Sequence, residues 1–508
     1  MAEARARAGS RRGDLLALGA GAILPLAFAP FDLYPLALLA LGALFLLWRD
    51  VGPGRAFLRG WLFGVGLFGV GVSWVFISIH RYGNASTGLA ALLTALFVLL
   101  LALFPALAGG LARRFGAGPL GVAVGFPAWW TLIEWSRDWF LTGFPWLSVG
   151  YSQLGAPLGG LAPVLGVYGV GAAAAFTAGL GAAAFAGRGR ARLVPAALAA
   201  LLWVIAWGLG TVHWTHPTGA PLPIALVQGN VSQDVKWRPE YLADVLERYA
   251  ALTERHWDSR LIVWPETAVP AFYHQVRDAF LDPLAAQARR HGSTLLIGVP
   301  VLGPKGARYY NAVVRLGAAG PPAFYFKHHL VPFGEYVPLH RYLDNLLRFL
   351  DIPWSEFSAG AAYQRPLTVA GHPIQTSICY EDAFPGEIIR YLPQAQLLVN
   401  VSDDAWFGDS LAPHQQLQIA RMRARETGRY LLSDTNDGIT AIVAPDGAVL
   451  ERAPQFRATV LTGTVRFMEG ATPYVRWGNL PAVLLAALGA AAALLFGDSI
   501  PITRSPPA

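Results

Sequence analysis

The segment Gln375–Asp382, QTSICYED, contains the only cysteine of this 508-residue chain. A short β-like run, Ile374–Ile378, precedes Cys379, and a helix-like run, Phe384–Tyr391, follows an acidic pair. A strand that enters a tight turn and then a helix can expose a nucleophile at the edge of a sheet. A single cysteine is more often a small buried hydrophobic residue, so the segment needs support from other parts of the chain.

The composition is that of a membrane protein. The chain is 54% hydrophobic and 14% charged, with a mean hydropathy of +0.41, which is too apolar for an ordinary soluble protein. Its single cysteine excludes an intrachain disulfide. The net charge of +7 invites a nucleic-acid interpretation, but the arginine clusters fall mostly between apolar segments. We therefore expect a membrane as partner and no nucleic acid.

Eight apolar segments predict an α-helical membrane bundle of about eight spans. They are Leu15–Ala29, Tyr34–Trp48, Phe57–Ile79, Leu89–Leu111, Leu120–Trp135, Leu161–Phe185, Leu193–Leu209 and Leu480–Phe496. The first two are shorter than the ~20 residues that a bilayer core needs. The arginine-rich loops between the spans fall on the side of the N-terminus, which the positive-inside rule makes cytoplasmic. The residues after Gly210 are then outside, and the last span returns the C-terminus to the cytoplasm.

Three features of the predicted spans leave alternatives open. Ala27-Phe28-Ala29 looks like a signal-peptide cleavage site, but the apolar run that follows favours a turn between two spans. Residues 64–69, GVGLFG, match a dinucleotide fingerprint, but no strand precedes them, so close helix packing is the preferred interpretation. Glu134 is an intramembrane carboxylate, which suggests a function, whereas Arg137 offers it a simple ion pair.

From about Pro221 to Val465, short β-like runs alternate with amphipathic helical runs, which predicts one α/β domain with a sizeable core. The predicted strands are Pro223–Gln228, Arg260–Trp264, Thr294–Val299, Asn311–Leu316, Ala323–Lys327, Ile374–Ile378, Leu397–Val401, Tyr430–Ser433, Thr440–Val443 and Thr459–Thr464. The predicted helices include Pro239–Trp257, Gln275–His291 and Pro413–Gly428. The expected domains are residues 1–219 with seven spans, the extracytoplasmic residues 220–470, and a C-terminal helix and tail, 471–508.

Reactive side chains stand at the ends of three predicted strands. Glu266 follows LIVWP, Lys327 follows FYF, and Cys379 follows QTSI. The carboxyl ends of such strands can converge on one rim of a sheet, although each residue alone is more simply a capping or solvated charge. Lys327 is the more informative, because only three of the 39 basic residues are lysines. A compact ammonium can hydrogen-bond an oxyanion, a role that guanidinium does not simply replace.

Four motifs together resemble one family. WPET at 264–267, FYFKHHLVPFGEYVP at 324–338, ICYED at 378–382 and NVSDDAWFGDS at 400–410 are similar to those of the apolipoprotein N-acyltransferases, the membrane branch of the nitrilase superfamily. The similarity covers nearly the whole chain, including the predicted topology. It implies an α/β nitrilase-like αββα sandwich beside the bundle, in the bacterial inner membrane, with the catalytic domain periplasmic and both termini cytoplasmic.

The resemblance also implies site residues. A Glu-Lys-Cys triad falls on Glu266, Lys327 and Cys379. The supporting active-site candidates are Glu335, Tyr380 and Glu381, and the substrate-binding candidates are Trp237 and Asn311. Two departures affect the surroundings of the triad and leave the triad itself intact. Asp403 stands where the family pattern has asparagine, and Ser433-Asp434 stand where it usually has arginine and a small residue.

The implied reaction is a two-step acyl transfer without a cofactor. Glu266 removes the thiol proton of Cys379, the thiolate attacks an acyl ester of a phospholipid, and Lys327 holds the oxyanion with the N–H after the cysteine. The resulting thioester then acylates the α-amine of a diacylglyceryl apolipoprotein. Trp237 and Tyr342–Trp354 are candidate lids or acyl-chain contacts, with ordinary packing as the alternative. We expect a monomer and no metal site, since no HExxH or CxxC pattern occurs.

Two other functions are compatible with parts of the sequence. A membrane-tethered nitrilase-type amidase would share the triad and the thioester but would use water as the acyl acceptor. A transporter or scaffold with a binding domain outside the membrane would not need Cys379. A bundle of seven or eight spans, rather than one anchor, favours lipid substrates.

Overall fold

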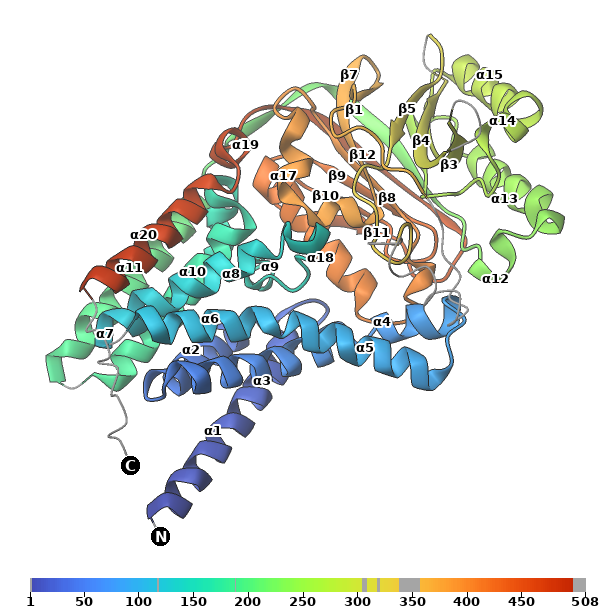
Figure 1. Cartoon of the computed structure of the whole chain (residues 1–508). Coiled ribbons are helices and arrows are strands. Elements are labelled where there is room, and N and C mark those ends of the chain that lie inside the picture. The colour runs from blue at the N-terminus through green and yellow to red at the C-terminus, as the bar shows by residue number, and fades with distance from the viewer. Residues whose placement is uncertain are drawn as a thin grey trace. The chain divides into compact units, whose positions relative to one another are not determined.

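The computed structural model describes residues 2–116, 118–187, 189–303, 308–317, 320–337 and 357–496 (Figure 1). The lid candidate Tyr342–Trp354 therefore lies outside the described residues. The chain divides into two compact units, each of which draws on separate parts of the sequence. The first comprises Met1–Ser73, Ala91–Val212 and Trp477–Ala508, and the second comprises Trp74–Ala90 and His213–Arg476.

The first unit is helical. Its main helices are α1 (Ala2–Ile23), α2 (Pro35–Arg49), α3 (Pro53–Gly71), α5 (Thr87–Leu101), α6 (Leu103–Phe115), α8 (Phe126–Ser136), α10 (Ala162–Ala186), α11 (Leu193–Leu209) and α20 (Leu480–Phe496). Within the described residues, Thr87–Phe115 and Pro157–Ala186 are long and apolar enough to cross a membrane. A third span results if Pro53–Gly71 and Val75–Tyr82, which are bent by 61°, count as one. The number of eight spans remains a prediction.

Small residues allow close contacts in this bundle. In the GVGLFG segment, a β-carbon on Gly64 would lie 2.6 Å from the Cα of Ala102, so only glycine lets these backbones approach. The helix-packing interpretation of this segment is confirmed. Glu134 and Arg137 form a buried ion pair of 3.5 Å, and Glu134 also accepts the N–H of Val149 at 2.9 Å. The expected ion pair is present but is buried and not on the helix surface, and a function of Glu134 stays a prediction.

The predicted span Phe57–Ile79 is interrupted. Helix α3 ends at Gly71, and α4 (Val75–Ile77) begins a differently directed segment that belongs to the second unit. The indole of Trp74 donates to Oε1 of Gln415 at 3.1 Å and packs edge-on against Phe407. These contacts hold Trp74, at the start of the segment after the break, within the second unit.

The second unit contains two six-stranded sheets. The first has the order β12-β1-β2-β3-β4-β5, and the second has the order β11-β10-β9-β8-β7-β6. The strands of the first sheet are β1 (Thr215–Gln228), β2 (Leu261–Trp264), β3 (Thr294–Leu302), β4 (Tyr309–Leu316), β5 (Ala323–Phe326) and β12 (Thr459–Gly470). Those of the second are β6 (Leu367–Val369), β7 (His372–Ile378), β8 (Leu398–Ser402), β9 (Leu431–Thr435), β10 (Ala441–Val443) and β11 (Val449–Arg452). Strands β1–β3 are parallel to one another, as are β7–β9.

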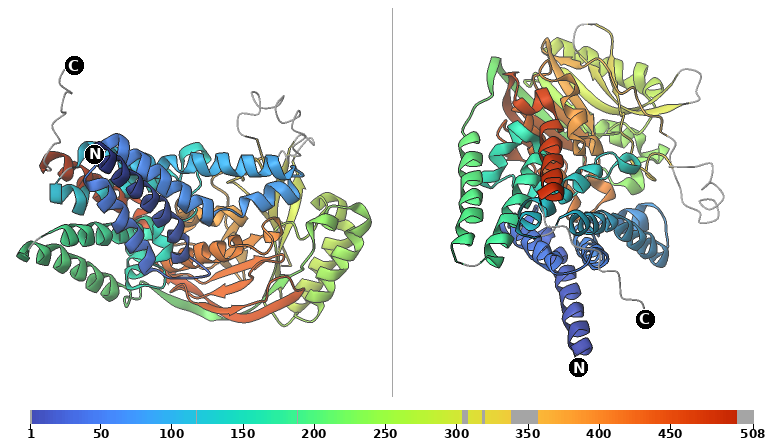
Figure 2. Two further views of the ribbon diagram at one scale, coloured as in Figure 1. Left: turned by 90° about the horizontal axis from the view of Figure 1, so that it is seen from below. Right: turned by 60° about the vertical axis from the view of Figure 1, so that its left-hand side comes forward.

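Helices cover the outer faces of both sheets (Figure 2). The helices are α12 (Gln233–Lys236), α13 (Leu242–Glu254), α14 (Tyr273–Val276), α15 (Asp282–His291), α17 (Pro385–Ile388), α18 (Ala412–Thr427) and α19 (Pro473–Trp477). Helices α13 and α15 pack on the first sheet, and α18 packs on the second. The αββα sandwich predicted for this domain is thus present.

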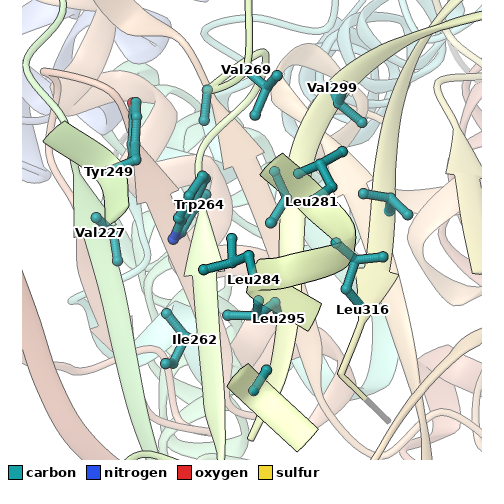
Figure 3. Packing of buried hydrophobic residues seen from close by; sticks show 14 of the residues in the cluster. Val227, Tyr249, Ile262, Trp264, Val269, Leu281, Leu284, Leu295, Val299 and Leu316 are labelled. Carbon is teal, nitrogen blue, oxygen red and sulfur yellow. The ribbon is translucent and has the colours of Figure 1, made fainter. Parts of the chain in front are cut away.

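Strand periodicity explains the layers. In β2, Ile262 and Trp264 point toward α13 and α15, whereas Leu261 and Val263 point toward the second sheet. Figure 3 shows Trp264 among the side chains of the outer cluster, where it stacks on Tyr249 with ring centroids 5.0 Å apart. Because both faces of each sheet are buried, the strands read as continuous apolar runs instead of alternating ones.

All ten predicted strands are present, with shifted ends. The three predicted helices are present too, although Gln275–His291 is divided by a π-helical turn, Arg277–Leu281, and Pro239–Trp257 begins with a 3-10 turn, Pro239–Tyr241. The sequence pattern does not predict β6 and β11, which are only three and four residues long. Short edge strands carry too few residues for a periodic signal.

Candidate active site

The strand directions bring Glu266 and Lys327 to the same rim of the first sheet. Strand β5 is antiparallel to β4, which is antiparallel to β3, so β5 runs in the same direction as β2 and β3. Glu266 follows β2 and Lys327 follows β5, both at carboxyl ends. A β-carbon on Gly298 of β3 would lie 2.1 Å from the carbonyl oxygen of Pro265, so glycine makes room for the Trp-Pro-Glu turn.

Cys379 occupies a strained turn directly after β7. Its φ of +53° lies in the left-handed region, which is uncommon for a residue other than glycine. A 3-10 turn, Cys379–Ala383, follows immediately, and α17 begins at Pro385. The strand–turn–helix arrangement predicted for this segment is confirmed, and the half-buried thiol is carried on a backbone that the surrounding structure holds in place.

Four side chains of the first sheet form a connected network. Lys327 Nζ donates to Oε1 of Glu335 at 2.9 Å and to Oε1 of Glu266 at 3.3 Å. The side-chain amide of Asn311 bridges the same two carboxylates, at 2.6 Å from Glu266 and 3.1 Å from Glu335. Glu266 Oε2 accepts the N–H of Asp403 at 3.0 Å. Every carboxylate oxygen of Glu266 is therefore bonded, which is what a buried charge requires.

Burial and pairing set the protonation states. Burial raises the pKa of Glu266, and the charge of Lys327 opposes this rise. Burial alone would lower the pKa of Lys327, but Glu266 and Glu335 outweigh it and raise that pKa above its ordinary value. Burial and the charge of Glu266 raise the pKa of the Cys379 thiol. The site thus combines a thiol and a carboxyl whose pKa values are raised with a lysine whose pKa is also raised, so the thiol would need a proton acceptor before it could act as a nucleophile.

Glu381 braces the turn at Cys379. Its carboxylate accepts four hydrogen bonds, from the backbone N–H groups of Ile378, His328 and His329 and from the hydroxyl of Tyr325, at 2.7–3.1 Å. Burial raises its pKa to about 7 despite these donors. Glu381 therefore joins the cysteine turn to the segment that follows Lys327. Tyr380 is buried beside it, with its ring edge-on to Phe384 at 5.0 Å.

Trp237 is the predicted site residue that lies apart from this network. Its side chain is 48% exposed, directly after α12. The preceding residue, Lys236, is instead 2% exposed and reaches the backbone of Glu266. The structure thus brings seven of the eight candidates together on the two strand rims and leaves Trp237 at the surface beside them.

The two departures from the family pattern are both buried. Asp403 pairs with Lys236 at 2.5 Å, and its two oxygens also accept the side-chain amides of Gln233 and Asn436. Ser433 and Asp434 lie on β9 and are 4% and 0% exposed. Burial raises the pKa of Asp434 well above its ordinary value. The extra carboxylate at 403 is compensated by a lysine.

Residues that sequence reasoning does not identify also contact the site. Lys236 supports Glu266, and Asn400 donates its side-chain amide to the carbonyl oxygen of Cys379 at 3.1 Å. The signal that distinguishes Lys327, the rarity of lysine in this chain, applies equally to Lys236. No comparable signal marks Asn400. Among the described residues, no group of three or more His, Cys, Asp and Glu side chains is placed to hold a metal ion.

Comparisons with known proteins cover both units. The carbon-nitrogen hydrolase family model matches residues 223–472, and the model for an apolipoprotein N-acyltransferase N-terminal domain matches residues 20–180. The chain is 52% identical to an apolipoprotein N-acyltransferase of Methylococcus capsulatus over 93% of its own length and 94% of that protein. Similar proteins of Coxiella burnetii and Azotobacter vinelandii are 43% and 46% identical, over 92% and 94% of this chain and 97% and 93% of theirs.

Proposed function

The chain belongs to the apolipoprotein N-acyltransferases, and on this premise we propose that it moves an acyl chain from a membrane phospholipid, through Cys379, to the N-terminal amine of a diacylglyceryl apolipoprotein. The observation that carries the proposal is the bonded network of Glu266, Lys327, Glu335 and Asn311, in which Glu266 and Lys327 act electrostatically on the Cys379 thiol of the facing sheet. A thiol, a base and an oxyanion-binding cation are the groups that acyl transfer through a thioester needs.

In the first step, Glu266 takes the proton from the Cys379 thiol and the sulfur attacks the ester carbonyl carbon. The oxyanion is held by Lys327 and by the backbone N–H of Tyr380. The carbon–oxygen ester bond then breaks, and Glu266 returns its proton to the departing lysophospholipid oxygen. Glu335 and Asn311 keep the ammonium and the base in their relative positions. The product is an acyl thioester on Cys379.

In the second step, the neutral α-amine of the apolipoprotein attacks the thioester carbon. The same donors hold the second oxyanion, the carbon–sulfur bond breaks, and Glu266 transfers the surplus amine proton to the leaving sulfur. An amide forms and the thiol is restored. Glu381 keeps Cys379 in its strained turn throughout, whereas Trp237 is placed at the surface, where it contacts an acyl chain or the acceptor.

The setting is proposed to be the bacterial inner membrane. We take residues 1–219 as seven spans, 220–470 as the periplasmic catalytic domain and 471–508 as an eighth span and tail, with both termini cytoplasmic. The arginine distribution between the apolar segments supports this orientation. Both substrates carry lipid chains, so they approach within the bilayer. The chain acts as a monomer, and neither a nucleic acid nor a cofactor takes part.

The test is the intact mass of the detergent-purified chain after incubation with phospholipid, with Cys379→Ser alongside. We expect an acyl-sized adduct that hydroxylamine removes, that Cys379→Ser lacks, and that a diacylated lipopeptide discharges. Discharge by water alone would instead support the alternative, a nitrilase-type amidase. A folded chain that forms no adduct would refute the thioester route.

A further inference from the structure

A second buried lysine lies behind the proposed base. The side chains of Lys236 and Asp403 are 1% and 3% exposed, and Nζ lies 2.5 Å from Oδ2. Lys236 is the last residue of α12, whose start is capped by Ser232 through a bond to the N–H of Asp234. An ion pair removed so completely from water requires further partners to offset its desolvation.

Those partners are parts of the Glu266 turn. Lys236 Nζ also donates to the carbonyl oxygen of Glu266 at 3.3 Å and to Oγ1 of Thr267 at 2.8 Å. Thr267 has a φ of +47°, so the residue after Glu266 is held in a conformation that threonine rarely adopts. Bonds from the ammonium to both residues stabilise this turn.

Asp403 reaches the same glutamate from the other sheet. Its backbone N–H donates to Oε2 of Glu266 at 3.0 Å, and its side chain is fixed by Lys236, Gln233 and Asn436. The carboxylate that is oriented by Lys327 on one oxygen is thus oriented by Asp403 on the other. Among the described residues, the hydrogen bonds of Lys236 and of the Asp403 side chain lead to the Glu266 turn and its supports and not to the thiol, which fits a positioning role.

We propose that Lys236 and Asp403 form a positioning pair that fixes the turn and orients the carboxylate of Glu266, and that the balance of their charges sets the pH at which Glu266 works as a base. The inference rests on the proposed function, because it takes Glu266 as the base. Beyond that function, it assigns a role to an ion pair that joins the two sheets. Its lysine, Lys236, directly precedes Trp237 in the chain.

The charges around Glu266 define the direction of each effect. The titratable groups that face it or its turn are Lys327, Glu335, Cys379, Asp403, Asp404 and Lys236. Removing the negative charge of Asp403 leaves an excess positive charge, which favours ionised Glu266. Removing the positive charge of Lys236 has the opposite effect.

The experiment measures the rate of acyl-adduct formation by intact mass, from pH 5 to 9, for wild type and three variants. Asp403→Asn should move the acidic limb of the profile to lower pH by roughly one unit, and Lys236→Met should move it to higher pH. Lys236→Met should also lower the rate at pH 7 roughly tenfold, since the base carboxylate is less ionised. The double variant should return the limb toward the wild-type position, because the charges are again balanced.

Asp278→Asn is the matched control. It removes one negative charge from an exposed ion pair with Arg277 and should leave the profile unchanged. Asp403→Asn keeps the shape of the side chain, so the test survives if Lys236→Met does not fold. The inference would be overturned if the acidic limbs of the pH–rate profiles of the two single variants stayed in place or moved in the same direction. A lower melting temperature of these variants would not rescue it, because it would show only a structural role. If wild type itself forms no adduct, the proposed function fails instead.

Discussion

The two sheets of the sandwich share a six-strand plan but stabilise their buried polar rims in different ways. On the first sheet, Glu266 and Glu335 are bonded on all their oxygens and paired with Lys327. On the second, burial raises the pKa of Asp404 to about 7 and that of Asp434 well above its usual range. The first rim thus pairs its buried charges, whereas burial disfavours the charged form of these two acids on the second; Asp403, which also follows the second sheet, is instead paired with Lys236.

This difference matters for chemistry. A base and an oxyanion-binding cation must be charged, so they require partners that are already in place. A cysteine nucleophile must instead be presented at a defined angle, and the second sheet achieves this with a positive φ and the brace of Glu381. Substitutions on both rims should lower rate and stability, but the loss of rate should be larger on the first rim, where the paired charges lie.

The largest effect is expected for Lys327→Met, because it removes the cation between two buried carboxylates. Acyl-adduct formation should fall by roughly 10³-fold, and the free energy of unfolding should fall by about 3–5 kcal/mol. Mass spectrometry and thermal melting measure the two losses. Arg277→Met, at an exposed ion pair, serves as the control. A rate within tenfold of wild type would mean that the paired rim is not catalytic.

Glu381→Gln tests the brace on the second rim. A glutamine presents one acceptor oxygen where the carboxylate presents two, so some of the four donors lose their partner. The free energy of unfolding should fall by about 1–3 kcal/mol, and adduct formation should slow by roughly 10–100-fold. Thermal melting measures the loss of stability, and single-turnover kinetics measure the rate of adduct formation. A loss of rate as large as that of Lys327→Met would place Glu381 among the reacting groups.

Asp434→Asn probes a neutral acid that is separate from the base network. A carboxyl with a raised folded-state pKa contributes stability that is complete below its unfolded pKa of ~4 and is lost as pH rises through the folded value. The variant lacks this loss, so its advantage over wild type in free energy of unfolding, measured by chemical denaturation, should grow between pH 4 and 8 toward about 2 kcal/mol. A difference that does not depend on pH would show that Asp434 is ionised in the folded domain.

The smallest effect is expected for Thr253→Val, on the outer face of the first sheet. Thr253 accepts the indole N–H of Trp264 at 2.9 Å, and both residues are fully buried. Loss of that acceptor should lower the free energy of unfolding by about 1–2 kcal/mol and leave the rate of adduct formation unchanged. Chemical denaturation gives the first quantity. A changed rate would mean that the helix layer is coupled to the rim.

The strands around the site were predictable because their signals are local. The β-like runs LIVW, AFYF and IQTSI end one or two residues before Glu266, Lys327 and Cys379. Glu266, Lys327 and Cys379 were found in this way, and the family motifs identified the other candidates. Lys236 and Asn400 were not found, because their roles depend on contacts with residues distant in sequence.

The break after α3 also could not be predicted from local sequence signals. The apolar run at 57–79 predicts one continuous span, yet α3 ends at Gly71, the next helical segment is bent by 61°, and Trp74 binds Gln415. Hydropathy reports the preference of each side chain for an apolar environment. It does not report whether that environment is lipid or another part of the protein.

The sequence by itself indicated the apolar helices and the α/β domain through local periodicity, and its family motifs indicated the αββα sandwich and the three residues of the proposed triad. Only the tertiary structure decided that Asn311 bridges two carboxylates, that Glu381 collects four donors and that Lys236 pairs with Asp403. These contacts join residues up to 167 positions apart. They form because sheet packing excludes water from both rims, and a buried polar atom must then find its partner within the protein.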